Sequence, residues 1–370
     1  MRVSVGVDLH KSQFTVYYRY EGTGEGILKQ YRTHRHGYEK FLCALRGYKA
    51  KGVSIEVAVE ATGNARYFKN VVEREDVKVR VINTLKFKVV NESVKKTDKH
   101  DARTIAEFLE KDMLPESKLC SEKSEAIRRI LKSRKLLVRA IVSLKNQVHG
   151  LLLGSGIESR KGDLQSAKKR QQILNVLAEH GYADATVKPL LETIDRLSEE
   201  VKKLEKVLIE LVKEDRAVEL VMSIPGAGII TASTISAYVD DINRFNSYKE
   251  FSSYAGLAPW VQTSNTTEHY GKITKRGPEP LRTAIVQIVL GMVRSRRTND
   301  YRIMKRYKAM KPHKGSGKTI IATARKLSKI IWYMLKNDTL FDPFKMTDPK
   351  IQRIMFEMRN AAMELESIPA

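Results

Sequence analysis

Cysteine is nearly absent from this chain of 370 residues, which contains only Cys43 and Cys120. Two cysteines are too few for a disulfide framework, and they lack the paired spacing that a structural zinc site needs. The scarcity therefore favours a protein of the reducing cytoplasm over a disulfide-rich secreted domain.

Long apolar runs are missing as well. No stretch of about 18 apolar residues occurs, as a membrane-spanning helix would require. The chain passes from Met1 directly into an alternating strand pattern, without the apolar segment of a signal peptide. We expect a protein that is neither exported nor embedded in a membrane.

Acidic residues are in the minority, since 67 Lys and Arg face 43 Asp and Glu and give a formal net charge of +24 at pH 7. A surplus of this size attracts polyanions, and such binding weakens strongly with salt. The composition therefore predicts a nucleic acid as partner. The length favours two or three domains.

Residues 1–115 predict an α/β domain. Strand patterns cover residues 3–7, 14–20, 27–32, 53–59 and 77–82, and helical patterns cover residues 38–46, 65–73 and 102–111. Three early strands followed by strand and helix repeats are typical of a mixed sheet flanked by helices.

Residues 116–215 predict a helical spacer. Apolar positions recur at steps of three and four from residue 121 to residue 153, with Arg134 as the one break. A coiled-coil seam follows at Ile194, Leu197, Val201, Leu204, Leu208 and Leu211. Its β-branched and leucine positions favour a parallel two-stranded dimer. The alternative is that the two long helices pack as an antiparallel hairpin within one chain.

Residues 216–340 predict a mostly helical domain with a polar, turn-rich interval at residues 259–280, and a tail of unknown role follows at 341–370. Near the start of this domain, Gly226 and Gly228 stand between two helical stretches. This pattern matches a helix-hairpin-helix, whose glycines let backbone amides approach a phosphate. An ordinary helix break is the alternative.

Four carboxylates form the principal candidate site. Asp8 and Glu60 end two strands, and Asp98 and Asp101 lie three residues apart at the entry to a helix. If they converge, their oxygens suit Mg²⁺, which prefers oxygen ligands and leaves positions for water or phosphate. Each acid could instead end a strand or cap a helix. The eight histidines show no metal-ligand spacing and are given no ligand role.

The interval at 259–280 carries the second candidate site. Its hydroxyl groups come from Thr263, Ser264, Thr266 and Thr267. Its cations are Lys272, Lys275 and Arg276, and Arg282 follows in the next helix. Hydroxyls beside cations suit attack on a phosphodiester. A solvated phosphate-binding loop without catalysis would look the same.

Residues Gly315 to Thr319 do not form a nucleotide-binding loop. That motif requires a glycine five positions before Gly317, where Pro312 stands, and no convincing strand precedes the segment.

The chain resembles a known family, the DEDD-type insertion-sequence transposases of the IS-one-ten and IS-eleven-eleven groups, which include the Piv invertases and bridge-RNA-guided recombinases. The matching stretches are Val5-Gly6-Val7-Asp8, Val59-Glu60-Ala61-Thr62-Gly63, Thr97-Asp98-Lys99-His100-Asp101-Ala102-Arg103, Ile224-Pro225-Gly226-Ala227-Gly228, Tyr254-Ala255-Gly256-Leu257-Ala258-Pro259, and Gly271-Lys272-Ile273-Thr274-Lys275-Arg276-Gly277 with Leu281-Arg282. They occur in the order of the family and span roughly residues 3 to 335.

The resemblance implies a RuvC-like, RNase H-type domain whose metal-binding tetrad is Asp8, Glu60, Asp98 and Asp101. It implies that Ser264 attacks DNA and forms a covalent phosphoserine with Mg²⁺ assistance. The family assembles this site from different subunits of a dimer or tetramer, and a structured noncoding RNA pairs with donor and target DNA. The chain departs from the family at Asn265, where glycine is usual, and at residues 278–280.

Two rival functions remain open at this point. A structure-selective nuclease of the RuvC type would use the acids to activate water and would form no covalent intermediate. A noncatalytic nucleic-acid-binding scaffold would use the helical spacer to join two binding ends.

Overall fold

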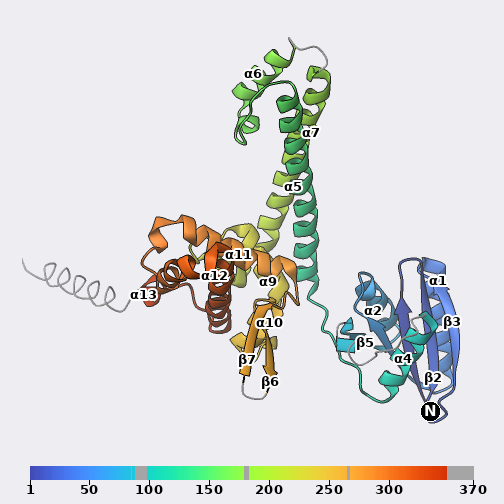
Figure 1. The fold of residues 1–370 in the computed structure, drawn as a ribbon. Helices are drawn as coiled ribbons and strands as arrows, with labels where there is room; N and C mark the ends of the chain where they lie inside the picture. Colours follow the sequence, from blue (N-terminus) through green and yellow to red (C-terminus); the bar gives the residue numbers. More distant parts are fainter. Residues whose placement is uncertain (85, 88–97, 179–182, 265–266, 348–370) are drawn as a thin grey trace, which may run out of the picture. The chain divides into compact units, whose positions relative to one another are not determined.

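The computed structural model describes residues 1–84, 86–87, 98–178, 183–264 and 267–347. The chain divides into two units, Met1–Leu119 and Cys120–Ala370 (Figure 1). The predicted helical spacer therefore shares one unit with the predicted C-terminal domain.

The first unit is built on a five-stranded sheet of β1 (Arg2–Leu9), β2 (Gln13–Tyr20), β3 (Gly26–Arg32), β4 (Ser54–Glu60) and β5 (Lys78–Ile82). Its strand order is β3-β2-β1-β4-β5. Strand β1 runs antiparallel to β2 and parallel to β4, and β4 runs parallel to β5. The predicted mixed sheet is confirmed.

One face of this sheet is covered by α1 (Arg35–Ala50) and α2 (Ala65–Glu73). Phe14 of the sheet meets Phe41 of α1 edge-on, with ring centroids 5.4 Å apart, and Phe68 of α2 lies in the same cluster. Because side chains alternate along a strand, the even-numbered residues of β1 point to the opposite face.

The opposite face carries α4 (Asp98–Glu110), which packs unusually close to β1. A Cβ atom added to Gly6 would lie 2.1 Å from the carbonyl oxygen of Ala102 and 2.4 Å from the amide nitrogen of Ala106. Such distances leave no room for any side chain. The absence of a side chain at Gly6 therefore lets the helix backbone approach the strand.

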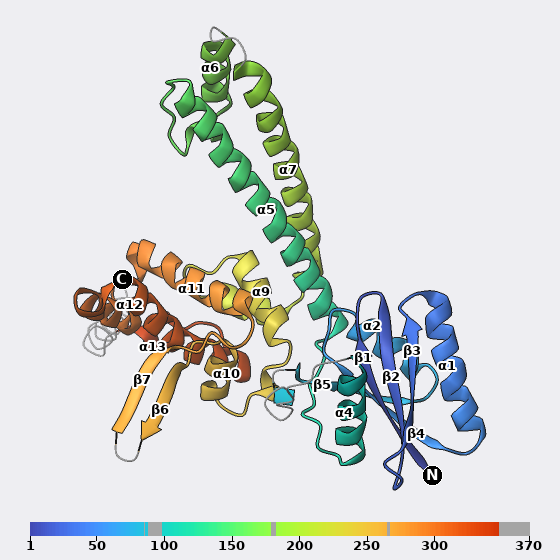
Figure 2. The same cartoon turned by 45° about the vertical axis from the view of Figure 1, so that its right-hand side comes forward.

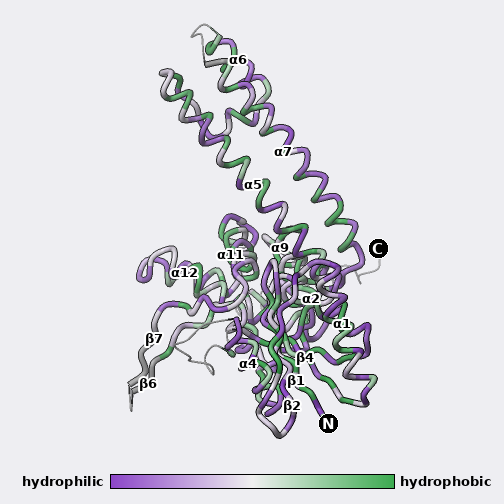
Figure 3. Tube along the Cα trace, turned by 90° about the vertical axis from the view of Figure 1, so that its right-hand side faces the viewer, coloured by the Kyte–Doolittle hydropathy of each residue, from purple (hydrophilic) through white to green (hydrophobic). Residues whose placement is uncertain are grey.

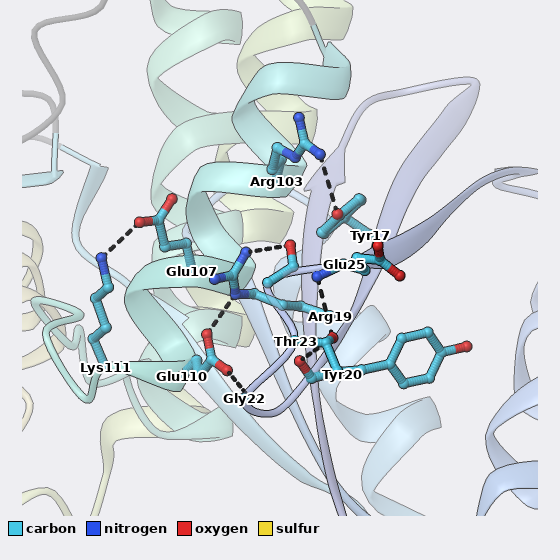
Figure 4. Close-up of polar contacts among 11 residues, drawn as sticks. Tyr17, Arg19, Tyr20, Gly22, Thr23, Glu25, Arg103, Glu107, Glu110 and Lys111 are labelled. Carbon is cyan, nitrogen blue, oxygen red and sulfur yellow. Dashed lines mark hydrogen bonds and ion pairs between the residues drawn. The ribbon is translucent and has the colours of Figure 1, made fainter.

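Polar contacts fix the other end of α4 on the β2–β3 hairpin (Figure 4). Glu110 accepts from the Arg19 Nε at 2.5 Å and from the Gly22 backbone amide at 3.3 Å. The guanidinium of Arg103 lies 5.2 Å from the centroid of the Tyr17 ring. These contacts and Gly6 fix where the first turn of α4 falls.

The second unit begins with α5 (Glu122–Gly154), α6 (Ala167–Ala178) and α7 (Ala183–Val212). Helices α5 and α7 lie side by side as an antiparallel hairpin (Figures 1 and 2). Along both helices, hydrophobic positions are interspersed with hydrophilic ones (Figure 3). That pattern suits helices that bury only one side.

The predicted coiled-coil seam is occupied within the chain. Ile194 and Val201 of α7 share a core cluster with Ile141 and Val148 of α5. The expectation of a parallel dimer through this seam is therefore wrong, and the antiparallel hairpin is correct. Arg134, the break in the apolar pattern, donates to Glu205 of α7 at 2.7 Å.

By length and composition alone, α5 is long and apolar enough to cross a membrane. It is the one helix among the described residues that passes this test, which a core helix of a soluble protein also passes. Its buried positions Ile141, Val148 and Leu152 pack in the core that α5 shares with α7, although only 11% of its apolar window is buried.

The remainder of the second unit contains α8 (Arg216–Met222), α9 (Ile229–Val239), α10 (Tyr248–Tyr254), α11 (Glu279–Arg294), α12 (Arg302–Lys336) and the short α13 (Pro343–Met346). They surround a single large core that includes Ile235, Phe251, Ile288 and Ile331. Helix α12 changes direction at Gly315, whose φ of 72° and ψ of 162° are not helical.

The interval expected to be rich in turns differs from the prediction, because much of it is a β-hairpin. Strands β6 (Pro259–Ser264) and β7 (Thr267–Ile273) pair antiparallel. Threonine, tyrosine, valine and tryptophan are frequent in strands, and several occur here, but the surrounding polar residues concealed the alternation. Residues 265–266, between the two strands in sequence, lie outside the described residues.

The close approach at Gly6 predicts that Gly6→Val will destabilise the first unit. Because the new side chain would meet the α4 backbone, we expect a loss of about 3 kcal/mol or more in the free energy of unfolding. Urea unfolding of the full chain measures it. Gly47→Ala is the control, since Gly47 lies in α1 with nothing within 4 Å of an added Cβ, and alanine there should be neutral or stabilising by up to about 1 kcal/mol. Equal effects of the two changes would contradict the explanation.

The intrachain hairpin predicts that Ile194→Ala will weaken α5 far more than Val207→Ala, because Ile194 is fully buried and Val207 is 56% exposed. Truncating a buried isoleucine costs about 2 to 5 kcal/mol. Hydrogen exchange of the α5 amides should show reduced protection in the first variant only. In the wild type, that protection should not change on dilution. Protection that disappears on dilution would indicate pairing between chains.

Candidate functional site

Two of the four predicted carboxylates end neighbouring parallel strands. Val7 of β1 pairs with Val59 of β4, so the next residues, Asp8 and Glu60, emerge side by side at the carboxyl edge of the sheet. This edge is where open α/β sheets place their ligand sites. Glu60 is partly buried, and Asp8 is only 8% exposed.

The other two carboxylates lie in the first turn of α4. Gly6 holds α4 against β1 two residues before Asp8, so Asp98 and Asp101 come to the same edge of the sheet. The partial positive charge at a helix N-terminus favours negative side chains there.

Three side chains come together closely enough to share a cation. Ligand atoms of Asp8, His10 and Asp98 all lie within 4.8 Å of one another. The His10 Nε2 lies 3.0 Å from the Asp8 Oδ2 and 3.4 Å from the Asp98 Oδ1. Asp101 and Glu60 do not belong to this group of three.

The electrostatics of this cluster favour a cation. Burial raises the pKa of the Asp8 carboxyl above its ordinary value, and His10 partly opposes the rise. The negative charges of Asp98 and Asp101 raise that pKa further. Desolvation would lower the pKa of His10, but the carboxylates of Asp8 and Asp98 outweigh it and raise that pKa. A buried carboxylate among like charges becomes more stable when a positive ion is added.

An unpaired hydroxyl lies beside the same strand end. Thr15 of β2 is the register partner of Asp8 and is 2% exposed. Its Oγ1 is buried and has no hydrogen-bond partner among the described residues. Buried polar atoms normally have a hydrogen-bond partner. A water molecule bound to an ion at this site would give the Thr15 hydroxyl such a partner, so the residues present suit an ion site. The carboxylate oxygens suit Mg²⁺ or Mn²⁺, and the imidazole also suits softer ions.

No histidine was predicted to be a ligand, whereas the structure places His10 against two carboxylates. The spacing Asp8, Leu9, His10 places both side chains on one face of extended backbone, because side chains alternate along a strand. That spacing is visible in the sequence, but it differs from the ligand spacings of structural zinc sites.

Ser264 is the last residue of β6, and it pairs with Thr267, the first residue of β7. It therefore lies at the tip of the hairpin, next to residues 265–266. The predicted hydroxyl competitor Thr266 lies outside the described residues, and so does Asn265, the departure from the family pattern.

The base of this hairpin is held by close backbone contacts. A Cβ at Gly277, whose φ is 100°, would lie 1.9 Å from the Tyr254 carbonyl oxygen, and one at Gly256 would lie 2.5 Å from the Arg276 carbonyl oxygen. Arg282 of α11 donates to the Lys275 carbonyl oxygen at 3.2 Å. Arg282 therefore braces the backbone where β7 ends, while Lys275 and Arg276 remain exposed.

The glycines between α8 and α9 have structural roles of their own. A Cβ at Gly226 would lie 2.8 Å from backbone atoms of Gly291 and Met292 in α11, so this glycine permits close packing. The backbone amide of Gly228 donates to the Thr231 Oγ1 at 3.0 Å and caps α9. Phosphate binding by these two glycines stays a prediction.

Two family models match this chain, and the first of them extends past the first unit into α5. Residues 5–156 match the model DEDD_Tnp_IS110, described as "Transposase", and residues 218–308 match the model described as "Transposase IS116/IS110/IS902 family". The sheet edge with its acids lies in the first match, and the hairpin with Ser264 lies in the second.

Curated relatives agree with these matches. The chain is 26% identical over 294 residues to a "Probable family 20 transposase" of Pseudomonas aeruginosa, covering 78% of this chain and 86% of the relative. It is 27% identical to the "Transposase for insertion sequence element IS1111A" of Coxiella burnetii, covering 75% and 77%. It is 23% identical to the "Pilin gene-inverting protein" of Moraxella bovis, covering 91% and 97%.

The fold and the two matches define a transposase, an enzyme that acts on DNA. Residues 5–156 and 218–308 are similar to transposases of the IS110 type, and pilin gene-inverting proteins are among the relatives of the chain. Its DEDD-type domain implies the use of a divalent metal, and the cluster at Asp8, His10 and Asp98 offers a possible site.

If this cluster is a metal site, Asp8→Asn should weaken Mn²⁺ binding to the full chain by about tenfold or more, because it removes the most buried carboxylate. Isothermal titration calorimetry without DNA measures this directly. Asp76→Asn is the matched control. It removes the same charge from the same unit, at a side chain that is 99% exposed. Equal Mn²⁺ affinity in both variants would show that the ion binds elsewhere.

Proposed function

We propose that this transposase cuts and exchanges DNA strands through a covalent phosphoserine at Ser264. The RuvC-like first unit holds Mg²⁺ with Asp8, Glu60, Asp98 and Asp101. The observation that carries the proposal is the combination of an acid cluster at a sheet edge with Ser264 at the end of β6, in a chain similar to transposases of the IS110 type.

The chemistry conserves the number of phosphoester bonds. The Ser264 Oγ forms a bond to the phosphorus of a DNA phosphodiester, and the bond from that phosphorus to one deoxyribose oxygen breaks. The serine proton passes to a base, and the departing oxygen takes up a proton. A hydroxyl of another DNA end then attacks the phosphoserine, which restores the DNA ester and frees the serine. No external energy source is required.

A serine hydroxyl needs activation, because it is a weak nucleophile at neutral pH. When bound, Mg²⁺ stabilises charge that develops on phosphate oxygens. The protein itself arranges carboxylates around the ion and supplies cations near the phosphate. The exposed Lys272, Lys275 and Arg276 follow Ser264 along β7 and its end, and they are suited to phosphate binding.

Recognition of DNA sequence is proposed to come from a partner RNA. In this proposal, a structured noncoding bridge RNA pairs with donor and target DNA, and the protein acts as a homodimer or homotetramer. The strongly basic composition, +24 at pH 7, supports binding of more than one nucleic-acid strand. In the wild-type structure, dimerisation would have to use surfaces other than the α5–α7 seam, because that seam is filled within the chain.

The covalent step predicts that Ser264→Ala will abolish the protein–DNA adduct, which denaturing gel electrophoresis detects after incubation with the element's DNA and RNA. Thr263→Ala should keep the adduct, since the neighbouring hydroxyl is not the nucleophile. Asp101→Asn should reduce adduct formation by about a hundredfold or more, as expected for loss of electrostatic stabilisation at a reacting phosphate, while DNA binding persists.

The alternative function, a structure-selective nuclease with metal-activated water, makes the opposite prediction for Ser264. Strand cleavage would then survive Ser264→Ala but be lost in Asp8→Asn. If neither the Ser264→Ala variant nor the Thr263→Ala variant forms a protein–DNA adduct, and both still cleave DNA, the nuclease function would replace our proposal.

A further inference from the structure

The second unit contains an open cleft of about 1190 Å³ between α10, the base of the β6–β7 hairpin and α12. Nine of its twenty lining residues are lysine or arginine, and none is aspartate or glutamate. These cations come from all three elements and include Lys249, Lys272, Lys275, Lys314, Lys318 and Arg325. The predicted site included only the two lysines of the hairpin region.

The walls of this cleft are firmly built. The hydroxyls of Ser252 in α10 and Ser328 in α12 lie 2.7 Å apart and are buried, so they join the two helices. The ammonium group of Lys329 lies 4.6 Å from the centroid of the Tyr248 ring. The break at Gly315 divides α12 into two segments, and both of them contribute lining residues.

These cations lack the carboxylate partners that some cations have elsewhere in the described part of the chain. In the first unit, for example, Arg80 pairs with Glu56 at 2.6 Å and Arg46 with Glu75 at 2.7 Å. In the described part of the chain, no ion pair joins any of the nine cleft cations to a carboxylate. Gathering like charges without counter-charges raises the free energy of the folded protein. A polyanionic ligand would reverse that cost.

The cleft is continuous with the strands that carry the proposed nucleophile. Pro259 of β6 and Gly271, Lys272 and Ile273 of β7 line it, and Ser264 ends the same β6. We propose that this cleft binds the phosphodiester backbone of the DNA beside the cleavage position. The choice of DNA as ligand rests on the proposed role of Ser264.

The chemistry of the lining indicates how the DNA is held. Tyr248 and His313 are the aromatic rings in the lining, against nine cations, so stacking on exposed bases contributes less than charge. Binding is therefore through phosphates, which positions DNA without reading its sequence. This division of roles fits a protein whose sequence recognition is proposed to come from RNA.

The test compares two variants with the same change in charge. Lys314, Lys318, Arg325 and Lys326 in the cleft are replaced together by glutamine, and in the control Lys132, Lys188, Lys202 and Lys206 of the α5–α7 hairpin are replaced likewise. All eight side chains are exposed, and glutamine keeps helix propensity. Both are made in full-length Ser264→Ala protein and measured with EDTA, so that no DNA is cut.

Affinity for a short duplex DNA of arbitrary sequence is then measured over a range of salt concentrations. We expect the cleft variant to bind about tenfold or more weakly at physiological salt. The slope of log affinity against log salt should be shallower by up to about 3.6, which is about 0.9 for each of the four lost phosphate contacts. The control variant should bind within about threefold of its parent. Equal losses in both variants would overturn the proposal, because affinity would then follow net charge alone.

The phosphates bound in the cleft could belong to RNA instead of DNA. The affinity of both variants for an RNA duplex of the same sequence is therefore measured as well. Loss of RNA binding with unchanged DNA binding in the cleft variant would overturn the assignment to DNA. If the α12 variant fails to fold, Lys249→Gln with Lys272→Gln tests the same cleft from other elements, with unchanged DNA affinity and salt slope as the contradicting result. An adduct that persists in Ser264→Ala would refute the nucleophile while leaving these binding results intact.

Discussion

The approach of helix α4 to strand β1 at Gly6 is the constraint on which the acid cluster depends. A helix packed at ordinary distance would stand several ångströms farther from the sheet, and its first turn would lie away from the strand end. Because the Ala102 carbonyl and the Ala106 amide sit directly over Gly6, Asp98 comes within reach of His10 and Asp8. The folded unit thus concentrates negative charge at one edge, and a divalent cation relieves the repulsion.

The second unit is organised by the same kind of contact between backbones. Gly226 crosses Gly291 so that α9 can lie against α11, and Gly277 lets the end of β7 pass the last turn of α10. Side chains at these positions would push the hairpin away from the helices. These glycine-containing segments therefore fix the base of the hairpin whose first strand, β6, ends at Ser264, and Lys272, Lys275 and Arg276 are exposed there. Among the described residues, the nine cations that line the cleft have no carboxylate partner, whereas Arg80 of the first unit pairs with Glu56.

The candidate sites show where sequence reasoning succeeded and where it failed. The acids were identified because strand ends and a helix start can be recognised locally, and the register Val7 to Val59 then brings Asp8 beside Glu60. His10 was missed, because its contact with Asp98 joins residues 88 positions apart in the chain, and no local pattern reports it. Gly226 and Arg282 were assigned to nucleic-acid binding, but a packing or bracing role for each appears only when α11 is in place.

The sequence by itself determined the alternating strands of the first unit, the long amphipathic helices and the positive charge, because each depends on local spacing or on composition. Only the tertiary structure decided which surface fills the seam of α7, since Ile194 and Val201 are equally suited to a second chain and to α5. Because α5 and α7 belong to the same chain, the intrachain partner is available at high effective concentration. The tertiary structure likewise decided that cations of α10, β7 and α12 share one cleft, because residues distant in the chain become neighbours only through the packing of the core.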